Sequence, residues 1–221
     1  MNQPSTIKYS AVSALETNKV LRNTYALLSM TLFTSALAAL FAMAIGIGPM
    51  ASLGMMIGAI VIVWFVLPRS INSSMGIVWT FVFTSLMGAS LGPTLTYYVS
   101  LDQGPMIVMQ ALGMTGLIFF AMSGYVLTTK KNMSFMGGFL GAGLIVLLIC
   151  MVLNIFFGTP ATSLAISAAV VMLFSGFILY DTSRILRGEE TNYIAATVSM
   201  YLNLFNIFVH LLHILGVMND D

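Results

Sequence analysis

Charged residues are so scarce in this chain that their positions decide what it can fold into. Lys, Arg, Asp and Glu make up 7% of its 221 residues, whereas a soluble domain carries about 25%. Five uninterrupted stretches without them hold 183 residues, namely 23–68, 70–101, 103–129, 132–180 and 191–219. A soluble core, a disordered chain and a nucleic-acid-binding protein are therefore excluded. We expect an all-α protein that crosses a lipid bilayer several times.

The lengths of the uncharged stretches predict seven membrane-spanning helices. A spanning helix needs about 20 apolar residues, so each of the three shorter stretches can hold one. The two longer stretches can hold two each, because Gly46–Pro49 and Gly158–Pro160 interrupt them with helix-breaking residues. We expect spans near residues 24–45, 50–67, 76–98, 106–128, 136–157, 161–182 and 194–217. The predicted organisation is a tail at 1–22, a seven-span bundle at 23–218 and a short end at 219–221.

The basic residues predict how the bundle lies in the membrane. All eight fall in the tail or in the loops on one side: Lys8, Lys19, Arg22, Arg69, Lys130, Lys131, Arg184 and Arg187. The other side carries Asp102, Asp220 and Asp221 and no basic residue. Because basic loops stay in the cytoplasm, we expect a cytoplasmic N-terminus and an external C-terminus.

Polar side chains gather on one face of the predicted seventh span. At about 100° per residue, an arc of roughly 80° contains Ser199, Asn203, Asn206, His210 and His213. Polar side chains inside a bilayer usually face the interior of the bundle, so these positions are functional candidates. They either hold helices together through hydrogen bonds or line a polar path through the bundle.

Asp181 is the one acidic residue that adjoins an apolar span on the predicted cytoplasmic side. Arg184 follows three residues later and can pair with it along the helix, which would anchor the helix end. Alternatively, Asp181 is a carboxylate at the inner mouth of a polar path. Such a path would be gated by protonation or by a basic partner such as Arg69.

The sequence offers no constellation for catalysis, so an enzyme is not expected. Gly88–Gly92 matches the G-x-S-x-G pattern of hydrolases, but that motif needs a strand-to-helix turn. Within a membrane helix it predicts close helix packing instead, as do Gly54 with Gly58 and Gly137 with Gly141. A zinc site needs at least three protein ligands, and His210 and His213 have no acidic or thiol companion in their span. No metal and no cofactor is expected.

Several segments of the chain resemble the Bax inhibitor-1 family. The seven spans, Ile178–Asp181 and the final-helix segment Tyr201–Phe208 carry the resemblance, which covers nearly the whole chain. Four further segments are similar to the bacterial branch of modulators of the FtsH protease. They are Lys19–Tyr25, Tyr125–Thr129, Met133–Gly138 and Gly188–Ile194. The resemblance implies a bundle in which the other six helices enclose the seventh.

The resemblance implies one of two activities, of which the first is a pH-sensitive leak of calcium or protons. In such members two aspartates on the last two helices share protons, and an arginine after the second helix helps to latch the pore. Asp181 matches the first aspartate, and Arg69 lies near the place of the arginine. Asn203 occupies the position of the second aspartate. An amide there can still hydrogen-bond Asp181, but the two cannot titrate as a carboxylate pair.

The second activity is modulation of the membrane-anchored, ATP-dependent protease FtsH in the bacterial inner membrane. The resemblance implies that the protein binds the protease complex and, as a slowly processed substrate, slows degradation of other membrane proteins. The tail would be engaged first, and its charged residues Lys8, Glu16, Lys19 and Arg22 are the candidate contacts. We expect this function, with the leak channel as the alternative.

Overall fold

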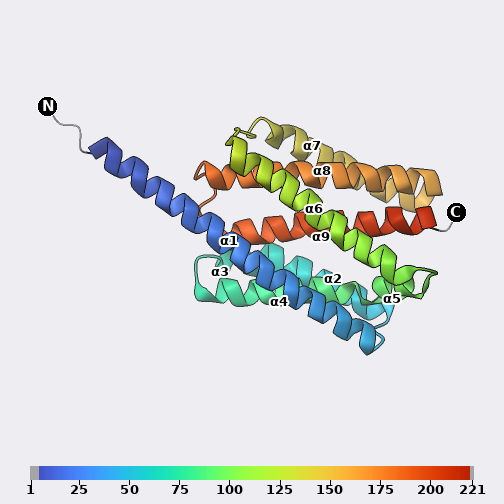
Figure 1. Ribbon diagram of the computed structural model, residues 1–221. Coiled ribbons are helices and arrows are strands. Elements are labelled where there is room, and N and C mark those ends of the chain that lie inside the picture. Colours follow the sequence, from blue (N-terminus) through green and yellow to red (C-terminus); the bar gives the residue numbers. More distant parts are fainter. Residues whose placement is uncertain (1–4, 220–221) are drawn as a thin grey trace. The chain divides into compact units, whose positions relative to one another are not determined.

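Every regular element between Ser5 and Asn219 is helical, as the sequence predicts. The computed structural model of the chain describes residues 5–219, and for residues 5–14 and 16 it describes the backbone alone. The elements are α1 (Ser5–Ala44), α2 (Pro49–Val61), the π-helix η1 (Ile62–Val66), α3 (Leu67–Ser70), α4 (Ser74–Ser90), α5 (Gly92–Ser100), α6 (Gly104–Thr129), α7 (Met136–Phe157), α8 (Pro160–Leu186) and α9 (Tyr193–Asn219) (Figure 1).

Seven segments in this range are long and apolar enough to cross a membrane, which confirms the predicted number. They are Thr17–Ala44, Pro49–Ser70, Ser74–Ser100, Gly104–Thr129, Met136–Phe157, Pro160–Leu186 and Tyr193–Asn219. Each predicted span falls within its observed counterpart, apart from one residue at the end of the first. Enclosure of the seventh helix by the other six stays a prediction.

The helices form two compact units. The described residues of the first unit are 5–92 and 184–201, which include α1 to α4 and the beginning of α9. Those of the second are 93–183 and 202–219, which include α6, α7, most of α5 and α8, and the rest of α9. Helices α8 and α9 therefore contribute residues to both units.

In the first unit, small residues let α1 pack closely against α4 and against Gly92, the first residue of α5. A Cβ atom added to Gly88 would lie 2.1 Å from the carbonyl oxygen of Ser35, and one added to Gly92 would lie 2.8 Å from the Cβ of Ala42. Only glycine permits such approaches without a shift of the neighbouring backbone. The predicted close packing at these two glycines is confirmed.

The same prediction is wrong for Gly54, whereas Gly58 makes an ordinary van der Waals contact and one glycine of the third pair packs closely. Among the described residues, no atom lies within 4 Å of a Cβ added to Gly54, and the nearest to one on Gly58 is a Leu86 methyl group at 3.7 Å. Gly137 lies against Tyr180, with 3.0 Å from its added Cβ to the hydroxyl oxygen, whereas Gly141 faces open space. The spacing of small residues creates a surface for close packing but does not determine whether a neighbour covers it.

Two prolines lie within the observed spans, Pro68 just beyond the predicted end of the second span and Pro93 inside the third. Pro68 follows the π-helical turn η1, in which the Leu67 N–H group donates to the Ile62 carbonyl five residues back. Pro93 follows a turn at Leu91 that separates α4 from α5, and the Ser52 hydroxyl on α2 donates to the Ser90 carbonyl beside this break. A proline lacks the N–H group that would continue the helical ladder, so each span adjusts its hydrogen bonding nearby.

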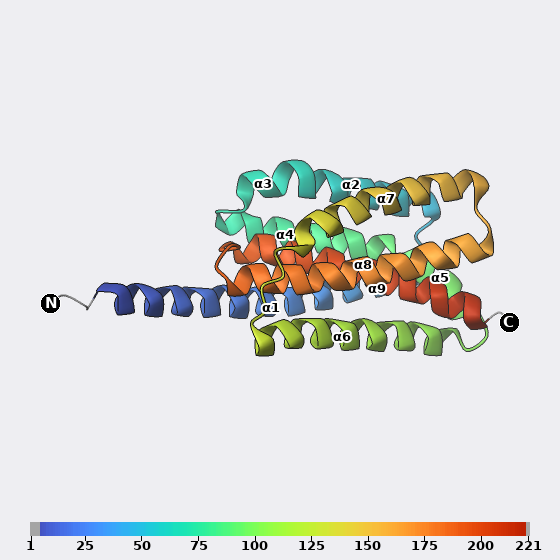
Figure 2. The ribbon, with the colours of Figure 1, turned by 90° about the horizontal axis from the view of Figure 1, so that it is seen from above.

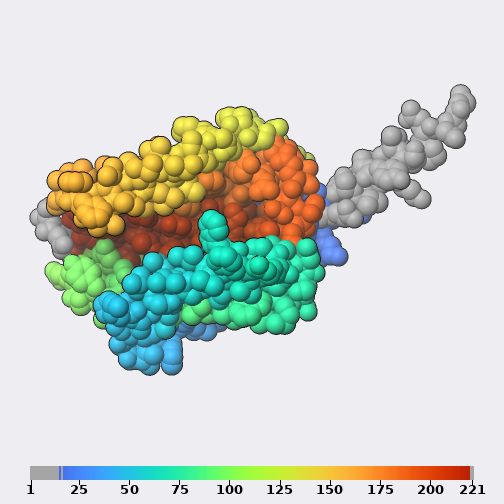
Figure 3. Space-filling model, turned by 180° about the vertical axis from the view of Figure 1, so that it is seen from behind, coloured from blue at the N-terminus to red at the C-terminus, as the bar shows by residue number. Residues whose placement is uncertain are grey.

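In the second unit, α7 and α8 form a closely packed pair joined by the turn at residues 158–159 (Figure 2). A Cβ added to Gly143 on α7 would meet Leu173, and one added to Gly176 on α8 would meet Leu140, each at 2.8 Å. Figure 3 shows α7 along the outside of this unit, where much of its apolar surface remains uncovered. That surface suits contact with lipid chains.

Helix α1 begins well before the first span does. Its first residue is Ser5, whereas the apolar segment starts at Thr17. These first 12 residues of α1 correspond to about 18 Å of helix, at 1.5 Å per residue. From Ser5 onward, the predicted tail is therefore the first part of a long helix.

Exchange of glycine for alanine should distinguish the packed glycines from the open ones. We expect Gly88→Ala to lower the free energy of unfolding by about 1–3 kcal/mol, because the new methyl group meets the backbone of Ser35. The control Gly54→Ala should leave it unchanged or raise it by up to about 1 kcal/mol, since alanine is the better helix former. Thermal unfolding in detergent, followed by circular dichroism, measures both. Equal losses in the two variants would contradict the packing described for α1 and α4.

Candidate functional site

Asp181 and Asn203 meet in the second unit. Asp181 lies near the C-terminal end of α8 and is 6% exposed, and Asn203 on α9 is 4% exposed. The Asn203 amide Nδ2 donates a hydrogen bond of 2.9 Å to the Asp181 carboxylate Oδ2. A buried carboxylate is stable only when it is hydrogen-bonded, and the amide supplies one such bond. The contact joins α8 to α9.

The two residues after Asp181 continue this polar cluster. Thr182 and Ser183 are both buried, although they lie at the end of an apolar span. The Thr182 hydroxyl lies 3.3 Å from that of Ser123 on α6. The Ser183 hydroxyl accepts a bond of 3.0 Å from the Met133 N–H group and donates one of 3.2 Å to the Lys131 carbonyl. Three consecutive side chains thus join α8 to α9, to α6 and to the α6–α7 loop.

Asp181 and Asn203 are candidate site residues on sequence grounds, whereas Thr182 and Ser183 are not. The available signal was the run of three polar residues at the end of span six. Hydroxyl groups are common at helix ends, so the run alone does not identify partners. Only the fold brings Ser123 and the α6–α7 loop beside them.

Further along α9, hydrogen bonds involve other members of the polar stripe, the predicted face of Ser199, Asn203, Asn206, His210 and His213. His210 Nδ1 lies 3.0 Å from the buried hydroxyl of Ser167 on α8, which joins these helices a second time. Asn206 donates to the carbonyl of Leu202 on its own helix at 2.8 Å. Ser199 and His213, the other members of the stripe, are half-buried. The contact of His210 favours the role of a helix cross-link, and a continuous polar path stays a prediction.

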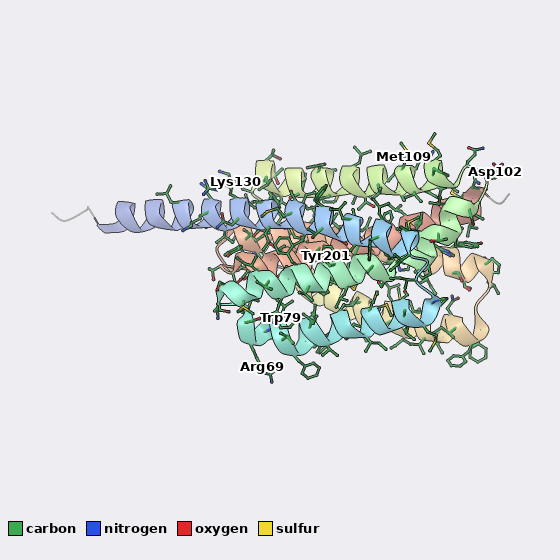
Figure 4. All side chains as sticks on the ribbon, turned by 90° about the horizontal axis from the view of Figure 1, so that it is seen from below. Arg69, Trp79, Asp102, Met109, Lys130 and Tyr201 are labelled. Carbon is green, nitrogen blue, oxygen red and sulfur yellow. The ribbon has the colours of Figure 1, made fainter. Side chains whose placement is uncertain are left out.

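The two arginines predicted to act on Asp181 have local partners in the first unit. Arg69 is exposed at the end of α3, points away from the helix axis (Figure 4), and donates to the carbonyl of Phe65 one turn earlier. Arg184 forms an ion pair of 3.4 Å with Glu190. Their roles as a latch or gate for Asp181 therefore stay predictions.

Tyr201 occupies a second buried polar cluster, in the first unit. Its hydroxyl lies 2.7 Å from that of Ser35 on α1 and donates at 3.1 Å to the carbonyl of Thr84 on α4. The rings of Tyr201 and Phe83 form an edge-to-face pair at a centroid distance of 5.5 Å. Tyr201 has no role among the sequence predictions, although at about 100° per residue it lies opposite the polar face of α9. The structure shows that this other face of α9 also carries a buried polar group, which cross-links α1, α4 and α9.

The segment Gly188–Ile194, which supported the family resemblance, forms a tightly bonded turn. Gly188 adopts a φ of +70°, which favours glycine. Asn192 caps α9 by accepting bonds from the N–H groups of Ile194 and Ala195, at 2.9 and 3.2 Å. Its amide also donates to the Ile71 carbonyl at 3.1 Å. The segment therefore fixes the start of α9 to the turn between α3 and α4.

The remaining candidates lie on the first part of α1. Lys19 and Arg22 are exposed there, whereas the side chains of Lys8 and Glu16 lie outside the described residues. Within the described part of the chain, no three His, Cys, Asp or Glu side chains come together to hold a metal ion. The site consists of paired polar groups that stabilise helix contacts, with one buried carboxylate.

These features define a polytopic α-helical membrane protein with buried polar cross-links in each unit. The family model described as "Inhibitor of apoptosis-promoting Bax1" matches residues 17–220. The chain therefore belongs to the Bax inhibitor-1 family.

Proteins similar to this chain occur in several bacteria, as three relatives show. It is 56% identical over 222 residues to a membrane protein of Vibrio cholerae, with 100% of each chain covered. It is 48% identical over 213 residues to the modulator of FtsH protease YccA of Escherichia coli, with 96% of each covered. A protein of Pseudomonas aeruginosa is 42% identical over 206 residues, which cover 93% of this chain and 92% of the relative.

The contact between Asp181 and Asn203 should contribute measurably to stability. We expect Asn203→Leu to lower the free energy of unfolding by about 1–3 kcal/mol, because a buried carboxylate loses a donor. Asn206→Leu is the control, since it removes a bond to its own helix, and should change stability by less than about 0.5 kcal/mol. Thermal unfolding in detergent compares the two. If the double variant with Asp181→Leu is additive with its single variants, the two side chains are not coupled.

Proposed function

We propose that this protein is an inner-membrane modulator of the ATP-dependent protease FtsH. The observation that carries the proposal is its 48% identity, over 96% of both chains, to the E. coli modulator of FtsH protease. The same relative is also named an inner membrane protein in a second E. coli strain. Similarity at this level over the full length supports a shared partner as well as a shared fold.

The proposal includes a cytoplasmic N-terminus and a periplasmic C-terminus. The distribution of Lys and Arg over the helix ends supports this orientation. Within the second unit, for example, Asp102 precedes α6 and Lys130 follows it, so the acidic and basic residues lie at opposite ends of one helix (Figure 4). This orientation puts the first part of α1 on the side where ATP is available.

In the proposed mechanism the protease engages the first part of α1. This segment precedes Thr17 and continues as the same helix into the first span. A force applied to the segment is therefore transmitted directly to the span. The candidate contacts are Lys8 and Glu16 in this segment and Lys19 and Arg22 just after it, at the start of the span. A helix that protrudes about 18 Å from the apolar segment is accessible to a membrane-anchored ATPase.

The packing around α1 supports a slowly processed substrate. Extraction of α1 would break the contact between Ser35 and Tyr201 and separate Ser35 from Gly88. A polar group exposed to hydrocarbon without a partner is costly, so each step of extraction is opposed. A substrate that occupies the protease for longer than others would slow degradation of other membrane proteins.

Removal of the tail tests this proposal directly. We expect the full chain to co-purify with FtsH from gently solubilised membranes and to lengthen the half-life of a second membrane substrate. A variant without residues 2–22 lacks all four candidate contacts, keeps residues 23–44 of the first span, and should lose both effects. A second variant that replaces residues 2–22 by an unrelated sequence of equal length controls for tail length. Unchanged binding and inhibition in the deletion variant would exclude the tail as the point of engagement.

The alternative function is a leak of calcium or protons, and the buried carboxylate of Asp181 is the observation in its favour. Its neighbour Asn203 carries no negative charge, and its amide nitrogen faces the carboxylate. That arrangement weakens the attraction for a divalent cation, because cations prefer several oxygen ligands.

Flux measurements separate the two functions. We expect calcium uptake into proteoliposomes to equal that of protein-free vesicles at every pH from 5 to 8, with no change in Asp181→Asn. Circular dichroism of the reconstituted protein shows that it is folded. Uptake that exceeds the blank and falls in Asp181→Asn would establish the leak instead.

A further inference from the structure

The α6–α7 loop presents an isolated pair of positive charges in the second unit. Between Asp102 and Asp181, Lys130 and Lys131 are the only charged residues of the chain. Both lysines are exposed, and Lys130 lies at the very end of α6 (Figure 4). Asp181 is buried and receives the Asn203 amide. Among the described residues of this unit, no exposed acidic side chain therefore accompanies the two lysines at this end of α6.

The loop is held in one conformation. Lys130 adopts a left-handed φ of +53°, which ends α6. The loop then crosses the C-terminal end of α8 (Figure 2), where Ser183 binds the Met133 N–H group and the Lys131 carbonyl. The Met133 side chain is buried as an anchor. These contacts anchor the backbone around both lysines to α8.

Lys131 is further oriented by Tyr125. Its Nζ lies 5.5 Å from the centre of the Tyr125 ring. A hydrogen bond with the Tyr125 hydroxyl raises the pKa of Lys131 above its ordinary value. Tyr125 therefore favours the charged form of this lysine.

An exposed aromatic surface follows the lysines directly. Phe135 is 78% exposed and Phe139 is 74% exposed, one helical turn further on α7. Gly138, beside Phe139, has no atom of the described chain within 4 Å of an added Cβ. Cations beside apolar rings, at the edge of a membrane-spanning helix, match an amphiphile that has an anionic head and an apolar tail.

We propose that the segment Lys130–Phe139 is a binding site for one anionic phospholipid. The two ammonium groups bind the phosphate of the headgroup, and an acyl chain lies along Phe135, Phe139 and the open surface at Gly138. A soluble acidic peptide would satisfy the lysines but would leave the two phenylalanines exposed. The lipid satisfies both parts of the surface, and it is present wherever the span is.

Native mass spectrometry of the full chain, purified in a neutral detergent, tests the proposal. The apparent Kd is measured for dioleoyl phosphatidylglycerol and for dioleoyl phosphatidylcholine, which differ in headgroup charge. We expect at least about tenfold tighter binding of the anionic lipid. The double variant K130Q/K131Q should weaken that binding about 25-fold, since each surface lysine contributes about fivefold.

Three further measurements make the proposal falsifiable. The control K19Q/R69Q removes two exposed charges at the ends of other spans and should stay within about twofold of the wild type. F135S/F139S keeps both lysines and should weaken lipid binding about tenfold, because it removes apolar contact area. Inorganic phosphate in large excess should not displace the lipid.

Each opposite result overturns the proposal. Equal losses in the control and the lysine variant would reduce the site to general surface charge. Equal affinity for the two lipids would remove the role of the headgroup, and an unchanged Kd in F135S/F139S would remove that of the acyl chain. Displacement by phosphate would make it a free-anion site. Far-ultraviolet circular dichroism confirms that each variant is folded before it is compared.

Discussion

The structure depends on one constraint: a polar group inside a hydrocarbon layer must find its partner within the protein. Nearly every buried polar side chain in the described part of the chain obeys it. Only three buried side-chain atoms there lack a partner, Thr24 Oγ1 and two nitrogens of Arg187, whose third nitrogen pairs with Glu189. The same constraint explains why the cross-links are few and specific. In each unit they join helices that would otherwise share only apolar contacts, which lipid chains could replace.

The number and limits of the spans could be predicted because charge has a strict meaning in a membrane. Fifteen charged residues divide the chain, and Gly-Pro segments divide the two longest uncharged stretches again. Hydropathy does not show how a span responds to an internal proline. The π-helical turn before Pro68 and the break before Pro93 depend on which carbonyls find other donors, such as the hydroxyl of Ser52. Nor does it show that α1 begins 12 residues before the apolar segment.

The candidate site could be predicted only in part, and the limit is again physical. Helical periodicity orders side chains around one helix, so it places Asn203, Asn206 and His210 on one face. It does not tell which neighbour each one meets, and these three differ in that respect. Tyr201 was missed because a single aromatic residue among apolar ones gives no signal until Ser35 and Thr84 lie beside it. The glycine pairs illustrate the same limit, since Gly88 and Gly54 have the same spacing to the next glycine and opposite surroundings.

The amide at position 203 changes what a buried carboxylate can do. Two carboxylates in hydrogen-bond contact must share a proton, so their contact depends on pH. An amide brings its own donor, and Asn203 therefore holds Asp181 whether or not a proton is available. The contact between α8 and α9 therefore needs no shared proton. A contact of this kind suits the function proposed above, in which a slowly processed substrate resists extraction by a protease. The pH-gated leak that the resemblance implies relies instead on a proton shared by two carboxylates, which Asn203 cannot provide.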